Sequence, residues 1–225
     1  MDYIRFLTFA YMGVDVFDAI DAEGDTLKKL ISKCALKAYQ DLKRRVPYTY
    51  NSIEANKPDN EKYRIKKEQF KASVIEIVIE AITKDGSLIS ESQIIPCKII
   101  ETVLEESKKS CYKTLFKDDF TVGLAQKWVN MTLKNLMAIQ IIKDGDTLDA
   151  PIDSYIIKAA KMERQARRTL GLGAKKYPKC AWSKWNNLEE YIAFQNEIKD
   201  IAREEFGMTA IAWENQAWVE IANQG

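Results

Sequence analysis

The sequence predicts an all-α protein. Nearly every apolar segment of the 225 residues repeats at intervals of three and four, the period of a helix with one buried face. Residues that start or stop helices stand at the ends of these segments. Hydrophobic residues at 46% and charged residues at 30% are typical of an ordinary globular protein. We therefore expect at least seven helices, little sheet, and one domain over residues 1–225.

Four helices joined by polar loops are expected in the N-terminal half. Asp25 is predicted to cap the second helix and Pro47 to end it. The third contains the β-branched run 74–79, which could form a strand, but the helical period extends beyond it and favours a helix. Pro96 is expected to open the fourth. The predicted ranges are 2–20, 25–46, 60–83 and 96–115.

Residues 118–160 form the unit around which the chain is organised. The segment 120–140 is apolar on most sides, as in a central, buried helix. Lys127, Asn130 and Lys134 recur on one side of it. A cationic stripe on a buried helix needs a cleft, a partner or a ligand, because an unpaired buried charge is costly. After a turn at residues 143–146, Pro151 and the pair Asp153–Ser154 predict the start of the next helix.

The segment 161–184 is strongly basic and ends in aromatic residues. It carries one acid among many cations, two glycines and Trp182, and Trp185 follows it directly. Basic residues mixed with glycine and aromatics suit a nucleic-acid backbone; a solvated loop explains the same charges equally well. The candidate DNA contacts are Arg167, Arg168, Lys175 and Lys176.

Two C-terminal helices are predicted within residues 187–223. Asn187 and Glu190 have the spacing of a capping box, and Gly207 is expected to stop the first of the two helices. The second contains Trp213 on an apolar pattern that extends towards residue 223.

Composition excludes several kinds of chemistry. Histidine is absent, which removes imidazole acid–base catalysis and the common zinc motifs. The four cysteines are scattered without a CxxC pair, so we expect reduced thiols and no metal cluster. We expect no cofactor. The N-terminus lacks the features of a secretion signal and no run is long and apolar enough to span a membrane, so a cytoplasmic protein is expected.

Lys127 and Asp153 are the candidate catalytic pair. A lysine at the head of a buried helix is a potential nucleophile, because desolvation favours its neutral amine. A nearby carboxylate would orient it or stabilise a cationic transition state. Taken singly, the lysine is more simply explained as one partner of an ion pair and Asp153 as a helix cap.

The segment Pro151-Ile-Asp-Ser-Tyr-Ile156 resembles the part of helix–hairpin–helix DNA glycosylases that carries their essential aspartate. Val122-Gly-Leu-Ala-Gln-Lys127 resembles their second hairpin helix, which bears the catalytic lysine. Within that superfamily the two segments are most similar to the archaeal 8-oxoguanine DNA glycosylases. The resemblance covers about residues 118–160. The usual hairpin has two glycines with the lysine two residues after the second, whereas here Gly123 stands alone and Lys127 follows four residues later.

The resemblance implies a two-lobed helical fold with the active site between the lobes. Its substrate would be double-stranded DNA with a flipped base. Lys127 would attack the sugar C1′ to give a Schiff base and strand cleavage, and Asp153 would assist. Backbone N–H groups near Gly123 would hold a phosphate. The residues that would contact DNA are Gly123, Gln126, Lys134, Arg167, Arg168, Lys175 and Lys176; Trp182, Trp185 and Trp213 are the candidates to stack on the base.

The alternative is a non-enzymatic α-helical regulatory protein that binds nucleic acid or protein, for which a phage or mobile-element origin is considered. In that case the central lysines form ion pairs, and residues 161–184 bind the partner. Binding to damaged duplex DNA distinguishes the two hypotheses.

Overall fold

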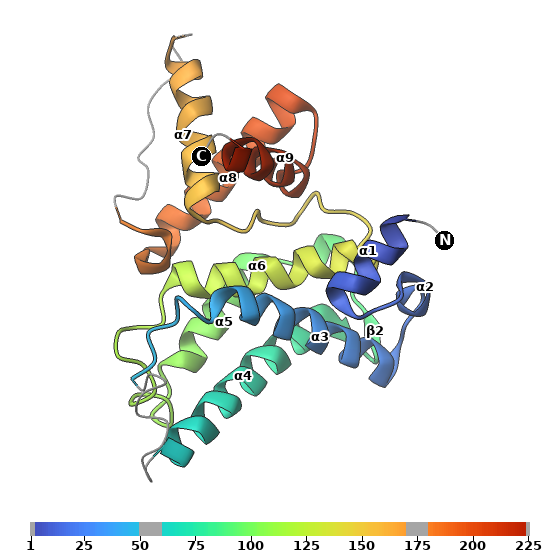
Figure 1. Ribbon diagram of the computed structural model, residues 1–225, viewed down its shortest axis with the longest axis vertical. Helices are drawn as coiled ribbons and strands as arrows, with labels where there is room; N and C mark the ends of the chain where they lie inside the picture. Colours follow the sequence, from blue (N-terminus) through green and yellow to red (C-terminus); the bar gives the residue numbers. More distant parts are fainter. Residues whose placement is uncertain (1–2, 50–59, 170–179, 224–225) are drawn as a thin grey trace.

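The computed structural model describes residues 3–49, 60–169 and 180–223 (Figure 1). These residues are mostly helical, so the predicted all-α class is confirmed. The helices are α1 (Tyr3–Met12), α2 (Val16–Ala19), α3 (Gly24–Leu42), α4 (Asn60–Ile82), α5 (Pro96–Ser107), α6 (Val122–Ala138), α7 (Ser154–Thr169), α8 (Leu188–Phe206) and α9 (Ala210–Asn223). Two short 3-10 helices are η2 (Glu91–Gln93) and η3 (Trp182–Lys184), and the strands β1 (Thr83–Lys84) and β2 (Ser87–Leu88) form an antiparallel hairpin.

Several predicted helix ends are wrong. The first helix is divided into α1 and α2 because Gly13 takes a positive φ of 66°. The second begins at Gly24 with Glu23 as its N-cap residue, so Asp25 lies in the first turn and is not the cap. The fourth helix ends at Ser107, well before residue 115. The β-branched run 74–79 is helical, as predicted, within α4.

Helix α6 lies at the centre of the core. It packs against α3 and α5, and most of its side chains are buried. Trp128 is fully buried, and its indole N–H donates to the Ala35 carbonyl of α3 at 2.9 Å. The rings of Phe70 and Phe120 meet it edge to face. This packing fixes the first turns of α6, which carry Lys127, against the N-terminal helices.

The helices form two groups on either side of the segment that joins α6 to α7 (Figure 1). One contains α3, α4, α5 and α6, which pack on one another. In the other, α9 packs on both α7 and α8. Because the connecting segment, residues 139–153, ends at Asp153, that residue is presented where the two groups meet.

No helix within the described residues combines the length and the apolar character needed to cross a membrane.

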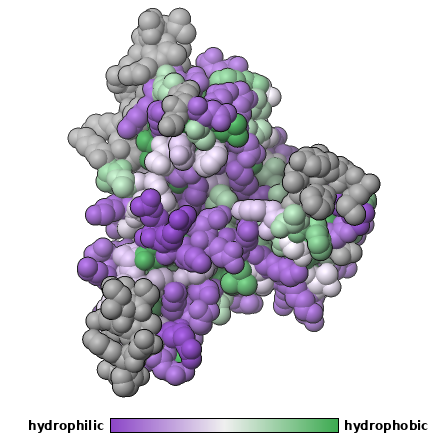
Figure 2. All heavy atoms as spheres, viewed as in Figure 1, coloured by the Kyte–Doolittle hydropathy of each residue, from purple (hydrophilic) through white to green (hydrophobic). Residues whose placement is uncertain are grey.

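On the face drawn in Figure 2, hydrophilic side chains predominate over α3 and α4.

Candidate active site

The start of α6 is packed against η3. The Thr121 hydroxyl caps the helix by accepting from the Leu124 N–H at 3.2 Å. The Gly123 N–H donates to the Trp185 carbonyl at 2.8 Å. A Cβ at Gly123 would lie 1.7 Å from the Trp182 carbonyl oxygen, so only glycine allows this approach. The Gly123 N–H is committed to this contact and is not free to hold a phosphate, whereas a role for other N–H groups near Gly123 stays a prediction.

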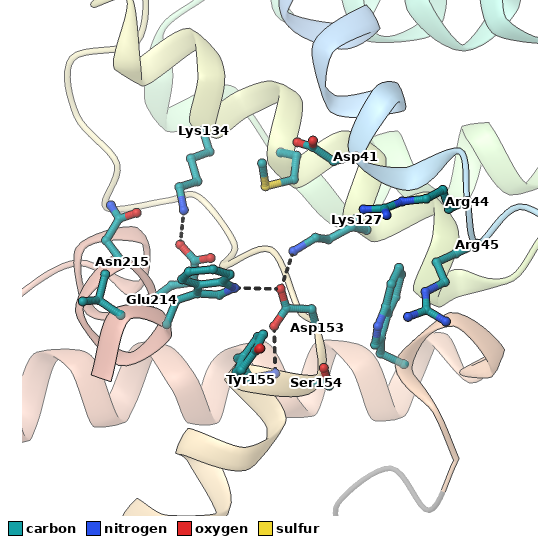
Figure 3. A pocket seen from close by; sticks show the side chains of 14 residues that line it. Asp41, Arg44, Arg45, Lys127, Lys134, Asp153, Ser154, Tyr155, Glu214 and Asn215 are labelled. Atoms are coloured by element: carbon teal, nitrogen blue, oxygen red, sulfur yellow. Dashed lines mark hydrogen bonds and ion pairs between the residues drawn. The ribbon is translucent and has the colours of Figure 1, made fainter. Parts of the chain in front are cut away.

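Lys127 and Asp153 come together across the junction of the two helix groups. The Lys127 Nζ lies 3.0 Å from the Asp153 Oδ2, and the two side chains are 12% and 16% exposed (Figure 3). The same oxygen accepts from the Trp218 indole N–H at 3.2 Å. Asp153 Oδ1 accepts from the backbone N–H groups of Tyr155 and Ile156 at 3.0 and 3.2 Å. Asp153 therefore caps α7 with one oxygen and holds Lys127 and Trp218 with the other.

Gln126 fixes the segment that carries Asp153. Its side chain is fully buried. The Nε2 donates to the Ile152 carbonyl at 2.8 Å, and the Oε1 accepts from the Ile152 N–H at 3.0 Å. The expectation that Gln126 contacts DNA is wrong, because its side chain is buried and bonded to the protein's own backbone. Its role is to set the position of Asp153 relative to the neighbouring Lys127.

A second buried cluster supports the same segment. Asn130 donates to the Ala150 carbonyl at 3.3 Å and to the Tyr191 hydroxyl at 2.8 Å. The Gln195 side chain pairs with both the N–H and the carbonyl of Ala150. The Tyr191 hydroxyl donates to Asp149 at 2.9 Å, and burial, followed by this carboxylate, raises the pKa of Tyr191 well above its ordinary value. Asn130 faces this cluster and not the cleft, so the stripe predicted on α6 is reduced to Lys127 and Lys134.

Lys134 lies deeper along α6 and is already paired. Its ammonium forms an ion pair with Glu214 of α9, whose side chain is 2% exposed (Figure 3). A carboxylate so deeply buried needs a cationic partner. The predicted contact between Lys134 and DNA would have to compete with this ion pair, although Lys134 does line the cleft.

Lys127, Lys134 and Asp153 line one cleft with a volume of about 790 Å³. Its walls come from the end of α3, from α6, from the start of α7, from η3 and from α9 (Figure 3). The other lining residues are Asp41, Arg44, Arg45, Met131, Ser154, Tyr155, Trp182, Glu214, Asn215, Trp218 and Val219. The size falls in the range of about 300–1,000 Å³ usual for sites that bind small ligands.

The aromatic lining differs from the prediction. Trp182 lines the cleft, as a stacking residue must. Trp185 and Trp213 are 2% and 3% exposed and belong to the core, so their assignment as base-stacking residues is wrong. Sequence reasoning missed Trp218, which is 40% exposed and lines the cleft with its ring 5.1 Å from that of Tyr155.

The basic segment is only partly within the described residues. Arg167 and Arg168 belong to the helical backbone of α7, whereas Lys175 and Lys176 lie outside the described residues. Arg44 and Arg45, which follow the end of α3, also line the cleft. The described residues contain no group of three or more acidic or cysteine side chains placed to hold a metal ion.

Comparison with models of protein families, with characterised proteins and with solved structures gives no match.

Proposed function

We propose that the chain is a DNA glycosylase and lyase that removes a damaged or modified base, with Lys127 as its nucleophile. The observation that supports this most directly is the Lys127–Asp153 pair at 3.0 Å on the wall of an open cleft. A lysine beside a carboxylate is what covalent attack on a sugar carbon requires. We further propose that the two helix groups correspond to the two lobes of a helix–hairpin–helix glycosylase and that 8-oxoguanine is among the bases removed.

The reaction begins with a proton transfer, because only the neutral amine is a nucleophile. Asp153 Oδ2, in contact with Lys127 Nζ, orients the amine and stays ionised, so the proton of Lys127 passes to the solvent of the open cleft. The amine then attacks C1′, and the bond from C1′ to the base breaks. The base leaves with the bonding electron pair and takes up a proton.

Opening of the sugar ring turns the new C1′–N bond into a Schiff base. Loss of a proton from C2′ then expels the 3′ phosphate by β-elimination and cleaves the strand. Asp153 contributes before this stage, because its negative charge stabilises the positive charge that develops at C1′.

The cleft offers surfaces for a base flipped out of the duplex. Trp182, Trp218 and Tyr155 line it, and aromatic faces stack on bases of any sequence. The Lys134–Glu214 pair lies on the same wall and presents a donor and an acceptor. A base that hydrogen-bonds to both groups should bind more tightly than a base that cannot. A polar group left without a partner when a base fills the cleft is costly.

Borohydride trapping on duplexes that each carry one damaged base, 8-oxoguanine among them, tests the proposal. Reduction of the Schiff base converts it to a stable cross-link. The wild type should form the cross-link, Lys127→Ala should form none, and Lys127→Gln should still bind the duplex. Lys143→Ala, on an exposed turn, is the matched control and should cross-link normally. Failure of the wild type to cross-link to any of the duplexes would contradict the proposal.

A non-enzymatic binding protein is the second candidate, because both cleft lysines are ion-paired. Such pairs are what a structural role for the lysines predicts. In that case damaged and undamaged duplexes should bind equally and no cross-link should form. We favour the enzyme because the pair lies on an open cleft and not within a closed core.

A further inference from the structure

Cationic side chains gather between the end of α3 and the first half of α4. We call this group the α3–α4 cationic strip, and its members are Lys43, Arg44, Arg45, Lys67 and Lys71. Arg44 and Arg45 line the cleft that contains Lys127 (Figure 3). Lys43 follows α3 directly, next to Arg44 in the chain, and its charge acts on Lys67 of α4. Figure 2 shows a hydrophilic surface over these two helices.

Two tyrosines support the lysines of the strip. The Lys67 ammonium lies 4.7 Å from the centre of the Tyr48 ring, and the Lys71 ammonium lies 5.0 Å from the centre of the Tyr39 ring. The two tyrosine hydroxyls are hydrogen-bonded to each other at 3.0 Å. Cation–π contacts attract each ammonium to its ring, so the two lysines are held near one place.

The strip carries more positive than negative charge. Glu68 pairs with Lys71 at 2.6 Å, and Asp41 lies on the cleft with the two arginines. Arg44 and Arg45 form no ion pair with the residues that the structure describes. The pKa of Lys67 is lowered, first by burial and then by repulsion from Lys71 and Lys43, against an opposing effect of Glu68. An anion bound here would relieve this repulsion.

We propose that the α3–α4 cationic strip binds the phosphate backbone of duplex DNA beside the mouth of the cleft. The inference rests on the proposed function, because a base can enter the cleft only if the duplex lies across its rim. The repeated phosphates of a DNA strand can engage several separate cations, which a compact anion cannot do. The strip lies on the α3–α6 side of the cleft, whereas the predicted DNA contacts Arg167 and Arg168 belong to α7.

Salt-dependent binding of the full chain to an undamaged, fluorescently labelled duplex tests this inference. The strip variant carries Lys43→Gln, Arg45→Gln and Lys67→Gln, and the control carries Lys28→Gln, Lys29→Gln and Lys98→Gln at exposed positions elsewhere. Binding is measured between about 50 and 200 mM salt. Removing one cation that binds a phosphate should reduce the slope of log K against log salt by about 0.9. The strip variant lacks three such cations, so its slope should fall by about 2.7, and the slope of the control should fall much less.

A strip variant whose slope equals that of the control would overturn the inference. The double variant Lys43→Gln/Arg45→Gln keeps Lys67 on its ring and should still lose about 1.8 of slope, so an effect of Lys67 on folding cannot imitate the result. The charge-conserving pair Lys43→Arg/Lys67→Arg should keep the wild-type slope. If the wild type cross-links but the strip variant keeps the wild-type salt slope, DNA binding by the strip is rejected and the glycosylase proposal stands. If the strip variant loses slope but the wild type does not cross-link, the glycosylase proposal is rejected and DNA binding by the strip stands.

Discussion

The side chain of Gln126 pairs with both backbone groups of Ile152, with its Nε2 2.8 Å from the carbonyl oxygen and its Oε1 3.0 Å from the amide nitrogen. Gln126 precedes Lys127, and Ile152 precedes Asp153. One buried amide therefore joins the two chain segments that carry the proposed nucleophile and its carboxylate. The relative position of the pair depends on this contact as well as on their own ion pair.

The substitution Gln126→Leu should destabilise the protein. The change leaves a buried N–H and a buried carbonyl of Ile152 without partners, at a cost of roughly 1–3 kcal/mol for each. Denaturant unfolding measures the loss in free energy of unfolding. Gln40→Leu, at an exposed position on α3, is the control and should change that free energy by less than about 0.5 kcal/mol. Equal effects of the two substitutions would show that the Gln126 contact does not support the fold.

Lys134 provides the control for the choice of nucleophile. Lys134→Ala should leave cross-linking by Lys127 in place but lower the free energy of unfolding by on the order of 3 kcal/mol, because it leaves the buried Glu214 unpaired. Adding Glu214→Gln should recover part of that stability. Stability is followed by thermal unfolding and cross-linking by gel. Loss of the cross-link in Lys134→Ala, together with its persistence in Lys127→Ala, would move the nucleophile to Lys134.

Neutralising the basic segment tests its predicted role. Arg167, Arg168, Lys175 and Lys176 are changed together to glutamine, and duplex binding is measured as a function of salt. If these residues bind phosphates, binding should weaken for every DNA sequence, and the salt slope should fall by about 0.9 for each phosphate that is no longer neutralised. An unchanged salt slope would indicate that the basic segment is a solvated loop. Other cations of the protein would then contact the DNA phosphates.

The sequence predicted the fold class and the central pair because both depend on local pattern. Lys127 follows Gly123 by one helical turn, and Asp153 stands at a helix start, so their places could be read from neighbouring residues. Other lining residues come from the end of α3, from η3 and from α9, which are distant in sequence from this pair. Only tertiary packing brings Arg44, Arg45 and Trp218 to the same cleft, and no local pattern records that.

The assignment of Trp213 to base stacking failed for a reason that lies in helix periodicity. Trp213, Ala217 and Ile221 are spaced four residues apart and share the buried face of α9. Trp218 follows Ala217 by one residue and therefore turns away from that face. The apolar pattern of α9 itself indicates which tryptophan is buried, whereas the placement of Trp218 on the cleft depends on how α9 packs on α7.

The last prediction separates the charge of Asp153 from its role as a helix cap. The substitution Asp153→Asn keeps an oxygen that can accept from the Tyr155 and Ile156 N–H groups, and asparagine caps helices as well as aspartate does. The variant should therefore unfold close to the wild type and bind duplex DNA. It should react slower by a factor of about 100 or more, because the charge that stabilises the transition state is lost.

Single-turnover rates on the best substrate measure the chemical step, and thermal unfolding measures the cap. Asp153→Ala is the matched comparison: it loses both the charge and the cap, so it should react as slowly and also lose about 0.5–2 kcal/mol of stability. A wild-type rate in Asp153→Asn would show that the carboxylate serves only to cap α7. The ion pair with Lys127 would then have a structural role only, and the reaction of Lys127 would not depend on the charge of Asp153.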